Sequence, residues 1–353
     1  MLDRLRRRFH TLSESIFNKQ VERFLYEDFI RFIPSDTGKP TVLYYAPTYD
    51  YGIKSLGLSF EELNFFNALL HMRYNLVKVD SLTGVRRIGS AQMMSLLRSL
   101  VDFYSVDFVF MSSFKNDYTT DGMEKITQQT DAITISWFSD DQWRYETHSR
   151  VLGGVIDLAV TTDPGSVEKY QHDGIPMLLS QWACNPFLYK HRNAEKAYDV
   201  CFIGQDYGSR AQIVRNIRNK GVRVAARGRG WPEGRVGFAD MIEIFNKSWI
   251  CLNLSESSRD DKLQIKGRDF EALACGCALV TRSSTGIEEY LTPGKECITY
   301  DSKGVVVDVI VELLGDKEKL RTIAAAAAAR VSREHTWPHR FEEIFSRAKK
   351  RWR

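Results

Sequence analysis

Short apolar segments of strand character alternate with helical segments along most of the chain, and this alternation limits the possible folds more than any other feature. The series begins with TVLYYAP (41–47), which the helical pattern SFEELNFFNALLHM (59–72) follows. It restarts with YDVCFIG (198–204) after a polar stretch, QWACNPFLYKHRNAEKA (181–197). Strands that alternate with helices predict βαβ units and a parallel sheet covered on both faces. The sequence therefore predicts an α/β protein with two doubly wound, Rossmann-like domains, for which 353 residues are sufficient.

The individual elements follow from the length and periodicity of the apolar segments. Strands are expected at 41–47, 75–80, 106–113, 132–138, 155–163, 175–180, 198–204, 221–228, 249–256 and 277–283. Helices are expected at 59–72, 90–103, 120–129, 303–314, 316–330 and 336–353. Ser59 occupies the cap position of the first of these helices, and Glu62 occupies the capping-box position.

The same pattern predicts how the chain is divided. We expect an N-terminal amphipathic helix over 1–35, a first Rossmann-like domain over 36–190, a second over 191–335, and a C-terminal helix over 336–353 that can cross back to the first domain. Within 1–33, apolar residues recur at three- and four-residue steps, and arginines lie beside that face. Such a helix suits an anionic membrane surface, its own protein or a second subunit, and the sequence leaves these alternatives open.

Composition and charge narrow the class of protein. A hydrophobic share of 43% and a net charge of +4 describe a globular chain rather than a polycation. Basic residues cluster at 4–9 and 347–353, where they can meet phosphate-rich surfaces. They do not form one stripe with interleaved aromatic residues, so we expect no nucleic-acid partner.

The cysteines and the hydropathy pattern indicate the cellular compartment of the protein. Six scattered cysteines without a C-x-x-C pair are typical of buried free thiols in a reducing compartment. The sequence also predicts no signal peptide and no apolar span of membrane length. We therefore expect a cytoplasmic protein, with a peripheral position at the inner face of the membrane left open.

The segment KGRDFEALACGCALVTRSSTGIEEYL, which begins at Lys266, carries the strongest functional signal. Lys266 and Arg268 lie at the expected start of a helix, where the helix dipole attracts anions. Glu271 follows on the same helix face and can accept hydrogen bonds from two ribose hydroxyls. Thr285 and Gly286 then form a turn whose N–H groups can bind a phosphate or a sugar hydroxyl. The features together predict a nucleotide site, and an Arg–Glu pair on an ordinary surface helix is the plainer alternative.

Two glycine-containing loops follow strands of the second domain. Gly204 ends the strand YDVCFIG and Arg210 enters the next helix, an arrangement that suits a phosphate. Gly228 ends the following strand and allows a flat ligand such as a nucleobase to approach the backbone, where Trp231 could stack on it. Neither loop carries a complete dinucleotide-binding or P-loop motif. A simple turn and a flexible surface loop are the competing interpretations.

Two adjacent carboxylates, Asp140 and Asp141, follow the expected strand AITISWF. At the carboxyl end of a parallel strand, a carboxylate is well placed to take a proton from a substrate hydroxyl. The pair could instead bind a metal ion, or Asp140 could cap the helix that starts near Gln142. His148 is a further candidate base.

Several of these motifs resemble one known family. The runs R-D-F-E-A-L-A-C-G-C-A-L-V-T (268–281), G-I-E-E-Y-L (286–291) and H-T-W-P-H-R (335–340) are similar to the carboxyl half of the CgeB-like glycosyltransferases. F-I-G-x-x-x-x-S-R (202–210) resembles the entry to that half, and the resemblance covers residues 40–345. These enzymes are relatives of the group-1 transferases with the GT-B fold, in which two Rossmann-like domains face each other across a cleft.

The resemblance implies a hexosyl- or related transferase that moves a sugar from a nucleotide-activated donor to a glycan or lipid-linked acceptor in bacterial surface polysaccharide synthesis. The second domain would bind most of the donor. Carried over by position, Arg210 and Arg268 hold the donor phosphates, Glu271 holds the ribose, and Gly286 with Glu289 holds the sugar–phosphate region. No metal and no other cofactor is expected, because basic side chains can stabilise the leaving phosphate.

One position departs from the family pattern. Many retaining relatives carry a glutamate eight residues before Glu271, where this chain has Leu263. The resemblance therefore leaves the stereochemical outcome open. A sugar-nucleotide epimerase of similar architecture and a non-catalytic nucleotide-sugar-binding protein remain as alternative functions.

Overall fold

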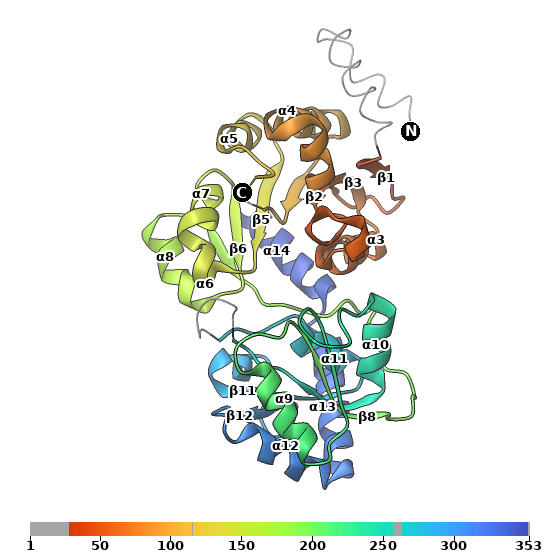
Figure 1. Ribbon diagram of the computed structural model, residues 1–353. Coiled ribbons are helices and arrows are strands. Elements are labelled where there is room, and N and C mark those ends of the chain that lie inside the picture. The colour runs from red at the N-terminus through yellow and green to blue at the C-terminus, as the bar shows by residue number, and fades with distance from the viewer. Residues whose placement is uncertain (1–27, 115, 257–262, 352–353) are drawn as a thin grey trace. The chain divides into compact units, whose positions relative to one another are not determined.

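Two sheets of mostly parallel strands organise the chain (Figure 1). The computed structural model describes residues 28–114, 116–256 and 263–351. These residues divide into a first unit, which holds the residues up to Leu179 and those from Ile344 onward, and a second unit, Ser180–Glu343. Each unit carries one of the sheets, so the predicted α/β class is confirmed.

The first sheet has the strand order β1-β3-β2-β4-β5-β6-β7 within the described residues. Only β1 runs antiparallel to its neighbour, and all other pairs are parallel. The strand order reverses between β2 and β4. In α/β proteins, ligands bind at such a switch point, beyond the carboxyl ends of the two strands. The strands are β1 Ile30–Ile33, β2 Thr41–Ala46, β3 Asn75–Asp80, β4 Phe108–Met111, β5 Ile133–Phe138, β6 Leu158–Thr161 and β7 Met177–Leu179.

Strand β1 corrects the prediction of an N-terminal helix over residues 1–35. Ile30 lies opposite Val79 of β3, and Phe32 lies opposite Val77. Buried Ile30 and half-buried Phe32 alternate with exposed Arg31, which is the two-residue period of a strand rather than the period of a helix. The remainder of the predicted helix, residues 1–27, lies outside the described residues.

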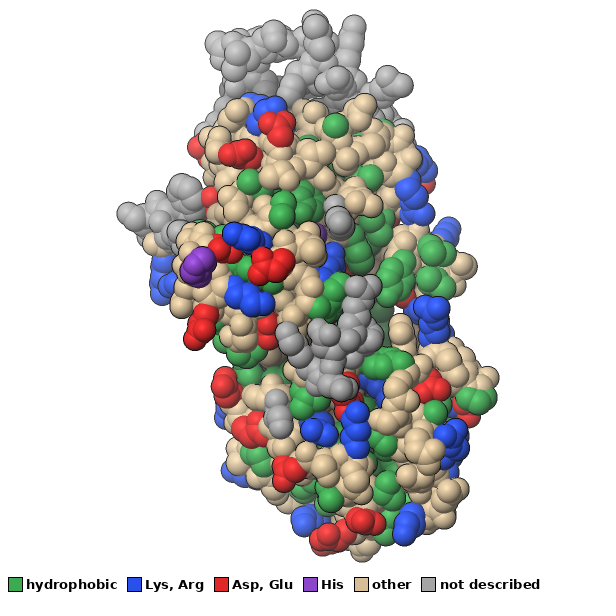
Figure 2. Space-filling view, turned by 60° about the vertical axis from the view of Figure 1, so that its left-hand side comes forward, with side chains coloured by type: hydrophobic (Ala, Val, Ile, Leu, Met, Phe, Trp, Pro, Cys, Tyr) green, Lys and Arg blue, Asp and Glu red, His purple; other side chains and the backbone are tan. Residues whose placement is uncertain are grey.

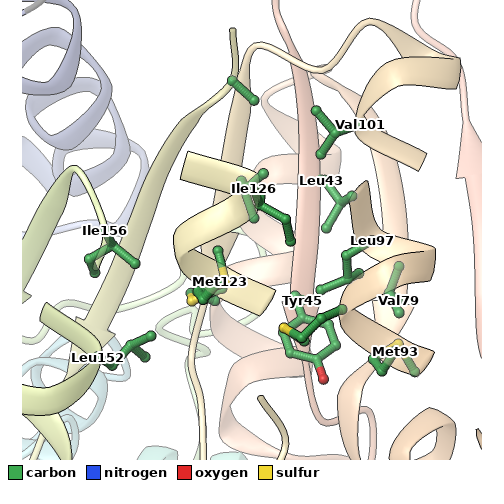
Figure 3. Close-up of a cluster of buried hydrophobic side chains, with 14 of the residues drawn as sticks. Leu43, Tyr45, Val79, Met93, Leu97, Val101, Met123, Ile126, Leu152 and Ile156 are labelled. Atoms are coloured by element: carbon green, nitrogen blue, oxygen red, sulfur yellow. The ribbon is translucent and has the colours of Figure 1, made fainter. Parts of the chain in front are cut away.

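Helices cover both faces of the first sheet. On one face, Leu43 and Tyr45 of β2 meet Met93 and Leu97 of α4 and Met123 of α5, all of them buried (Figure 3). On the other face, aromatic side chains of the sheet pack against a helical segment that begins near Phe60. The helices are α3 Asn67–His71, α4 Ser81–Tyr104, α5 Thr120–Gln129, α6 Asp141–Arg144, α7 Arg150–Gly153 and α8 Val167–His172, with short turns η1 Asp50–Gly52, η2 Lys54–Leu56 and η5 Pro164–Ser166.

Two π-helical turns, η3 Glu62–Phe66 and η4 Tyr145–Ser149, interrupt the helices of this unit. The predicted serine cap is present, since the Glu62 backbone N–H donates to Ser59 Oγ at 3.0 Å. The Glu62 carboxylate pairs with Lys78 at 2.6 Å instead of completing a capping box. π turns often mark functional positions.

The second sheet is parallel throughout, with the order β12-β11-β10-β8-β9 in the described part of the chain. Its switch point lies between β8 and β10. β12 was not predicted, because it lies in a short run, CITY (297–300), between Glu296 and Asp301. The strands are β8 Tyr198–Ile203, β9 Val224–Arg227, β10 Ser248–Leu252, β11 Ala278–Arg282 and β12 Ile298–Tyr300.

The helices of the second unit return the chain between these parallel strands. Helix α11 carries small residues where it packs on the unit's core: Ala272 within the helix and Cys275 directly after it are fully buried. The elements are α9 Arg210–Asn219, α10 Phe238–Asn246, α11 Arg268–Ala274, α12 Val306–Leu314 and α13 Lys317–Glu334, with short turns η6 Ser283–Thr285 and η7 Ile287–Glu289.

The H-T-W-P-H-R motif lies where the last helix, α14 Trp337–Arg351, begins. Cys184 N donates to the His335 carbonyl at 3.1 Å, and Trp337 N donates back to the Cys184 carbonyl at 2.9 Å. Arg340 Nε donates to the Gln181 carbonyl at 2.8 Å. The motif therefore ties the segment that leaves β7 to the start of α14, which is a structural role.

The end of α14 belongs to the first unit. There the ring of Phe345 stacks on Phe108 of β4 with 4.5 Å between centroids. The helix thus begins in one unit and ends in the other.

The six cysteines are all buried and none forms a disulfide, as the sequence predicts. Charged side chains of both signs are interspersed on the face shown in Figure 2. Among the described helices, none is long and apolar enough to span a bilayer.

Candidate active site

The residues predicted to bind a donor lie at the carboxyl end of the second sheet. This is the edge at which α/β proteins bind ligands. Gly204 and Arg210 follow β8, Gly228 follows β9, Lys266, Arg268 and Glu271 follow β10, and Thr285, Gly286 and Glu289 follow β11.

Gly204 and Gly228 bring two of these loops into backbone contact. Gly228 has φ +141°, and a Cβ atom there would lie 2.5 Å from the Gly204 carbonyl carbon and closer still to its oxygen. Gly204 N donates to the Arg227 carbonyl at 2.8 Å, and Trp231 Nε1 donates to the Gly204 carbonyl at 2.8 Å. Gly228 is therefore required for protein packing, and the Trp231 indole is buried beside Phe202 instead of being exposed for stacking.

Arg268 is the first residue of α11, and its guanidinium lies against the end of β8. A Cβ atom at Gly204 would meet Arg268 Nη1 at 2.9 Å, so the glycine leaves room for the arginine. Arg268 is partly exposed, and within the described residues its side chain makes no hydrogen bond and no ion pair. A guanidinium in this state can bind an anion through two parallel hydrogen bonds.

Arg210 has a different environment, although the sequence assigned it the same role. Its guanidinium is 5% exposed and donates to the carbonyls of Gln205 (3.0 Å), Leu254 (2.7 Å) and Glu256 (3.1 Å). Burial lowers the pKa of Arg210, and the nearby charge of Arg268 lowers it further. These bonds join the loops after β8 and β10 across the switch point. The contact of Arg210 with donor phosphates stays a prediction.

Asp269 is a site residue that sequence reasoning missed. Its Oδ2 accepts hydrogen bonds from Lys266 N and Asn253 Nδ2, both at 2.8 Å. Burial raises the pKa of this carboxyl to about 6. Asp269 thereby fixes the backbone just before α11 and so positions Lys266 and Arg268. The only sequence signal was an acidic residue between Arg268 and Glu271.

The remaining predicted donor residues are less closely grouped. Glu271 is buried, and its Oε1 accepts a hydrogen bond from the Tyr189 hydroxyl at 2.9 Å. Thr285 Oγ1 donates to the Arg282 carbonyl at 3.0 Å, and Gly286 adopts φ +78°. Glu289 is exposed. The structure thus brings Gly204, Gly228 and Arg268 together, and their roles toward a ligand stay predictions.

A cavity of about 210 Å³ lies at the carboxyl end of the first sheet. Its walls come from the loops after β2, β4 and β5, which surround the switch point of that sheet. The cavity is lined by Asp50, Tyr51, Phe60, Glu61, Ser112, Ser113, Phe114, Trp137, Phe138, Ser139, Asp140, Arg144, His148 and Ser149.

The two predicted catalytic aspartates have different surroundings. Asp140 lines the cavity, and its side chain makes no capping hydrogen bond to α6. Asp141 is fully buried, and its Oδ2 accepts a hydrogen bond from the Tyr170 hydroxyl at 2.9 Å. Burial raises the pKa of Asp141, against hydrogen bonds that lower it. Only Asp140 is therefore placed to meet a ligand in this cavity.

No group of three or more His, Cys, Asp or Glu side chains in the described ranges is arranged to hold a metal ion. His148 Nε2 lies 3.1 Å from the Ser113 carbonyl, so this histidine is engaged with the cavity wall.

Comparison with known proteins identifies the fold. Residues 210–346 match a family model described as glycosyl transferase-like. The search among curated proteins gives no match. The chain is structurally similar to a glycosyltransferase from Rickettsia africae (TM-score 0.59, 13% identity, 89% of this chain and 98% of that chain). It is also similar to sucrose-phosphate synthase from Thermosynechococcus elongatus (TM-score 0.58, 11% identity, 89% and 99%).

A third similar structure is HepE from Anabaena, solved with UDP and glucose (TM-score 0.54, 12% identity, 87% of this chain and 99% of that chain). These similarities confirm the predicted GT-B fold. Membership of the CgeB-like group stays a prediction.

Proposed function

We propose that the chain is a glycosyltransferase that moves a sugar from a nucleotide-activated donor, bound by the second unit, to an acceptor hydroxyl bound by the first unit. The observation that carries the proposal is the Arg268 guanidinium beside Gly204, at the switch point of the second sheet, which makes no hydrogen bond or ion pair within the described residues. The glycosyl transferase-like match includes Arg268, and the similar HepE structure contains UDP and glucose.

The proposed roles of the donor-site residues follow from the negative charge that develops on the leaving nucleotide. When the bond between the sugar and the donor phosphate breaks, the nucleotide leaves with growing negative charge. Arg268 would bind this phosphate, and Lys266, held at the same helix start by Asp269, would add a second cation. Glu271 would accept hydrogen bonds from the ribose, and Gly286 with Glu289 would contact the sugar–phosphate region. These cations would supply the stabilisation that a metal ion supplies elsewhere, so we propose a metal-independent reaction without a further cofactor.

The acceptor is proposed to be a glycan or a lipid-linked sugar of a bacterial surface polysaccharide. The cavity beside Asp140 offers carboxylates for sugar hydroxyls and aromatic rings for the apolar faces of a sugar ring. The basic sequences at 4–9 and 347–353 suit the anionic inner face of a membrane. Six buried free thiols support a reducing, cytoplasmic location.

A donor panel tests the proposal. The full chain is incubated with UDP-, GDP-, ADP-, dTDP- and CMP-sugars, with and without methyl and octyl glycosides as acceptors, and free nucleotide and new glycosides are measured. We expect one nucleotide class to be released, faster with an acceptor and equally fast in EDTA. Conversion of the donor sugar without nucleotide release would instead identify an epimerase. Donor binding without release under any of these acceptors would identify a binding protein.

A further inference from the structure

A second carboxylate, Glu61, lines the cavity of the first unit, and neither the sequence motifs nor the family resemblance assigns it a role. It follows β2, whereas Asp140 follows β5, so the two reach the cavity from different loops of the sheet's carboxyl edge. Glu61 directly precedes the π turn η3, and the π turn η4 contributes His148 to the same cavity. Two irregular turns that border one small cavity indicate a functional position.

Glu61 is held in place by hydrogen bonds. Ser112 Oγ, at the end of β4, donates to Glu61 Oε1 at 3.3 Å. The Tyr44 hydroxyl of β2 donates to the Glu61 carbonyl at 2.8 Å. Tyr44 lies in the central strand β2 and Ser112 directly follows the central strand β4, so Glu61 is held by rigid elements.

The adjacent Glu62 differs from Glu61 in its charge partner. Glu62 pairs with Lys78 at 2.6 Å, with both side chains largely buried. Glu61, partly exposed to the cavity, makes no ion pair within the described residues. A carboxylate that faces a cavity and makes no ion pair among the described residues is available to accept a proton.

The rest of the cavity suits a single sugar unit. At about 210 Å³ it is smaller than the pockets of about 300–1,000 Å³ that hold whole drug-sized ligands. Tyr51, 59% exposed at the rim, has φ +50°, and its ring lies 6.5 Å from that of Phe114. A non-glycine residue in this conformation is strained, and such strain is often found at binding sites. Aromatic rings beside carboxylates match the apolar faces and hydroxyls of a sugar.

We propose that Glu61 is the general base of the transfer reaction, and that the cavity between Glu61 and Asp140 binds the acceptor sugar by its reactive hydroxyl. The inference rests on the proposed glycosyltransferase function. The acceptor oxygen forms a bond with the anomeric carbon of the donor while its proton passes to the Glu61 carboxylate. The bond between the anomeric carbon and the phosphate oxygen breaks, and its electron pair leaves with the nucleotide. A single displacement of this kind inverts the anomeric centre.

The surroundings of Glu61 raise its pKa, as a general base requires. Burial, with a smaller contribution from the nearby Asp50, raises the pKa of Glu61 to about 6, although hydrogen bonds from Ser112 and Ser59 oppose the shift. Besides Glu61 and Asp50, the charged or titratable groups that line this cavity are Tyr51, Asp140, Arg144 and His148, and the adjacent Glu62 is paired with Lys78. A base must be ionised, so activity is present above about pH 6 and is lost as the pH falls through that value.

The test compares kcat/KM as a function of pH for the wild-type chain, Glu61→Gln, Glu61→Asp and Asp140→Asn, with the donor panel and glycoside acceptors named above. We expect Glu61→Gln to lower kcat by about 100-fold or more and to abolish the acidic limb near pH 6. Its nucleotide affinity should be unchanged. Glu61→Asp should retain part of the activity and an acidic limb. The exposed Glu124→Gln on α5 removes the same charge and should leave the profile unchanged.

The outcomes separate this inference from the proposed function. If the wild type binds no nucleotide and transfers no sugar, the proposed function fails and the role of Glu61 fails with it. If the wild type transfers sugar and Glu61→Gln keeps its kcat and acidic limb, only the role of Glu61 is overturned. The role of Glu61 would also be overturned if Asp140→Asn were the one variant to lose the acidic limb. A product with retained anomeric configuration would overturn it as well.

Discussion

Replacing Arg268 by alanine is expected to weaken nucleotide diphosphate binding about 10- to 100-fold, since a hydrogen-bonded charge pair contributes about 1.5–3 kcal/mol. The guanidinium lies at the start of α11 against Gly204 and has no partner among the described residues, so its removal should not unbalance the fold. Titration calorimetry with UDP, GDP, ADP, dTDP and CMP measures the effect. Arg268→Lys should recover part of the affinity, because the charge remains while the planar pair of donors is lost.

Two other arginines serve as controls for this prediction. Arg223 pairs with Asp199 at 3.1 Å near the start of β9, at the opposite edge of the sheet, so Arg223→Ala should leave nucleotide affinity unchanged. Arg210 donates to three backbone carbonyls, and Arg210→Ala should lower the stability of the second unit. Equal affinity for nucleotide in Arg268→Ala and wild type would contradict the assigned donor site.

Replacing Gly228 by alanine is expected to destabilise the second unit by about 3 kcal/mol or more. The new Cβ would lie 2.5 Å from the Gly204 carbonyl carbon, and φ +141° is strained for any residue with a side chain. The Gly204 backbone cannot retreat easily, because hydrogen bonds from Gly204 N to Arg227 and from Trp231 to Gly204 hold it on both sides. Denaturant unfolding followed by tryptophan fluorescence measures the loss, since Trp231 is buried at this contact.

Gly234 offers a matched control in the same loop. It also has positive φ, +69°, but a Cβ atom there would meet nothing within 4 Å. Gly234→Ala should therefore cost only about 1 kcal/mol, from backbone strain without a clash. If the two variants unfold at the same denaturant concentration, the close approach of the two loops is not as described.

The fold was predictable because it depends on patterns that a sequence carries locally. Alternating strands and helices, the cap at Ser59, and the basic start of α11 are set by neighbours in the chain. Strands β1 and β12 were not predicted, since β1 follows directly on a helical pattern and β12 lies in a run of only four residues between Glu296 and Asp301.

The site was only partly predictable, because side-chain direction depends on distant partners. Arg210 turns inward to the carbonyls of Leu254 and Glu256, more than forty residues away. Asp141 likewise bonds to Tyr170, while its neighbour Asp140 faces the cavity. Glu61 gave no signal, since a glutamate at a helix start is usually a solvated residue, and only the fold brings it to Ser112.

Hydrogen–deuterium exchange with and without the nucleotide selected by calorimetry tests where the donor binds. We propose that the carboxyl edge of the second sheet holds the donor nucleotide. At saturating nucleotide, we therefore expect slower backbone exchange in peptides that cover 204–210, 228–234, 266–272 and 283–289, with little change around β12 and α13. Protection confined to the first unit, or no protection at saturation, would contradict it.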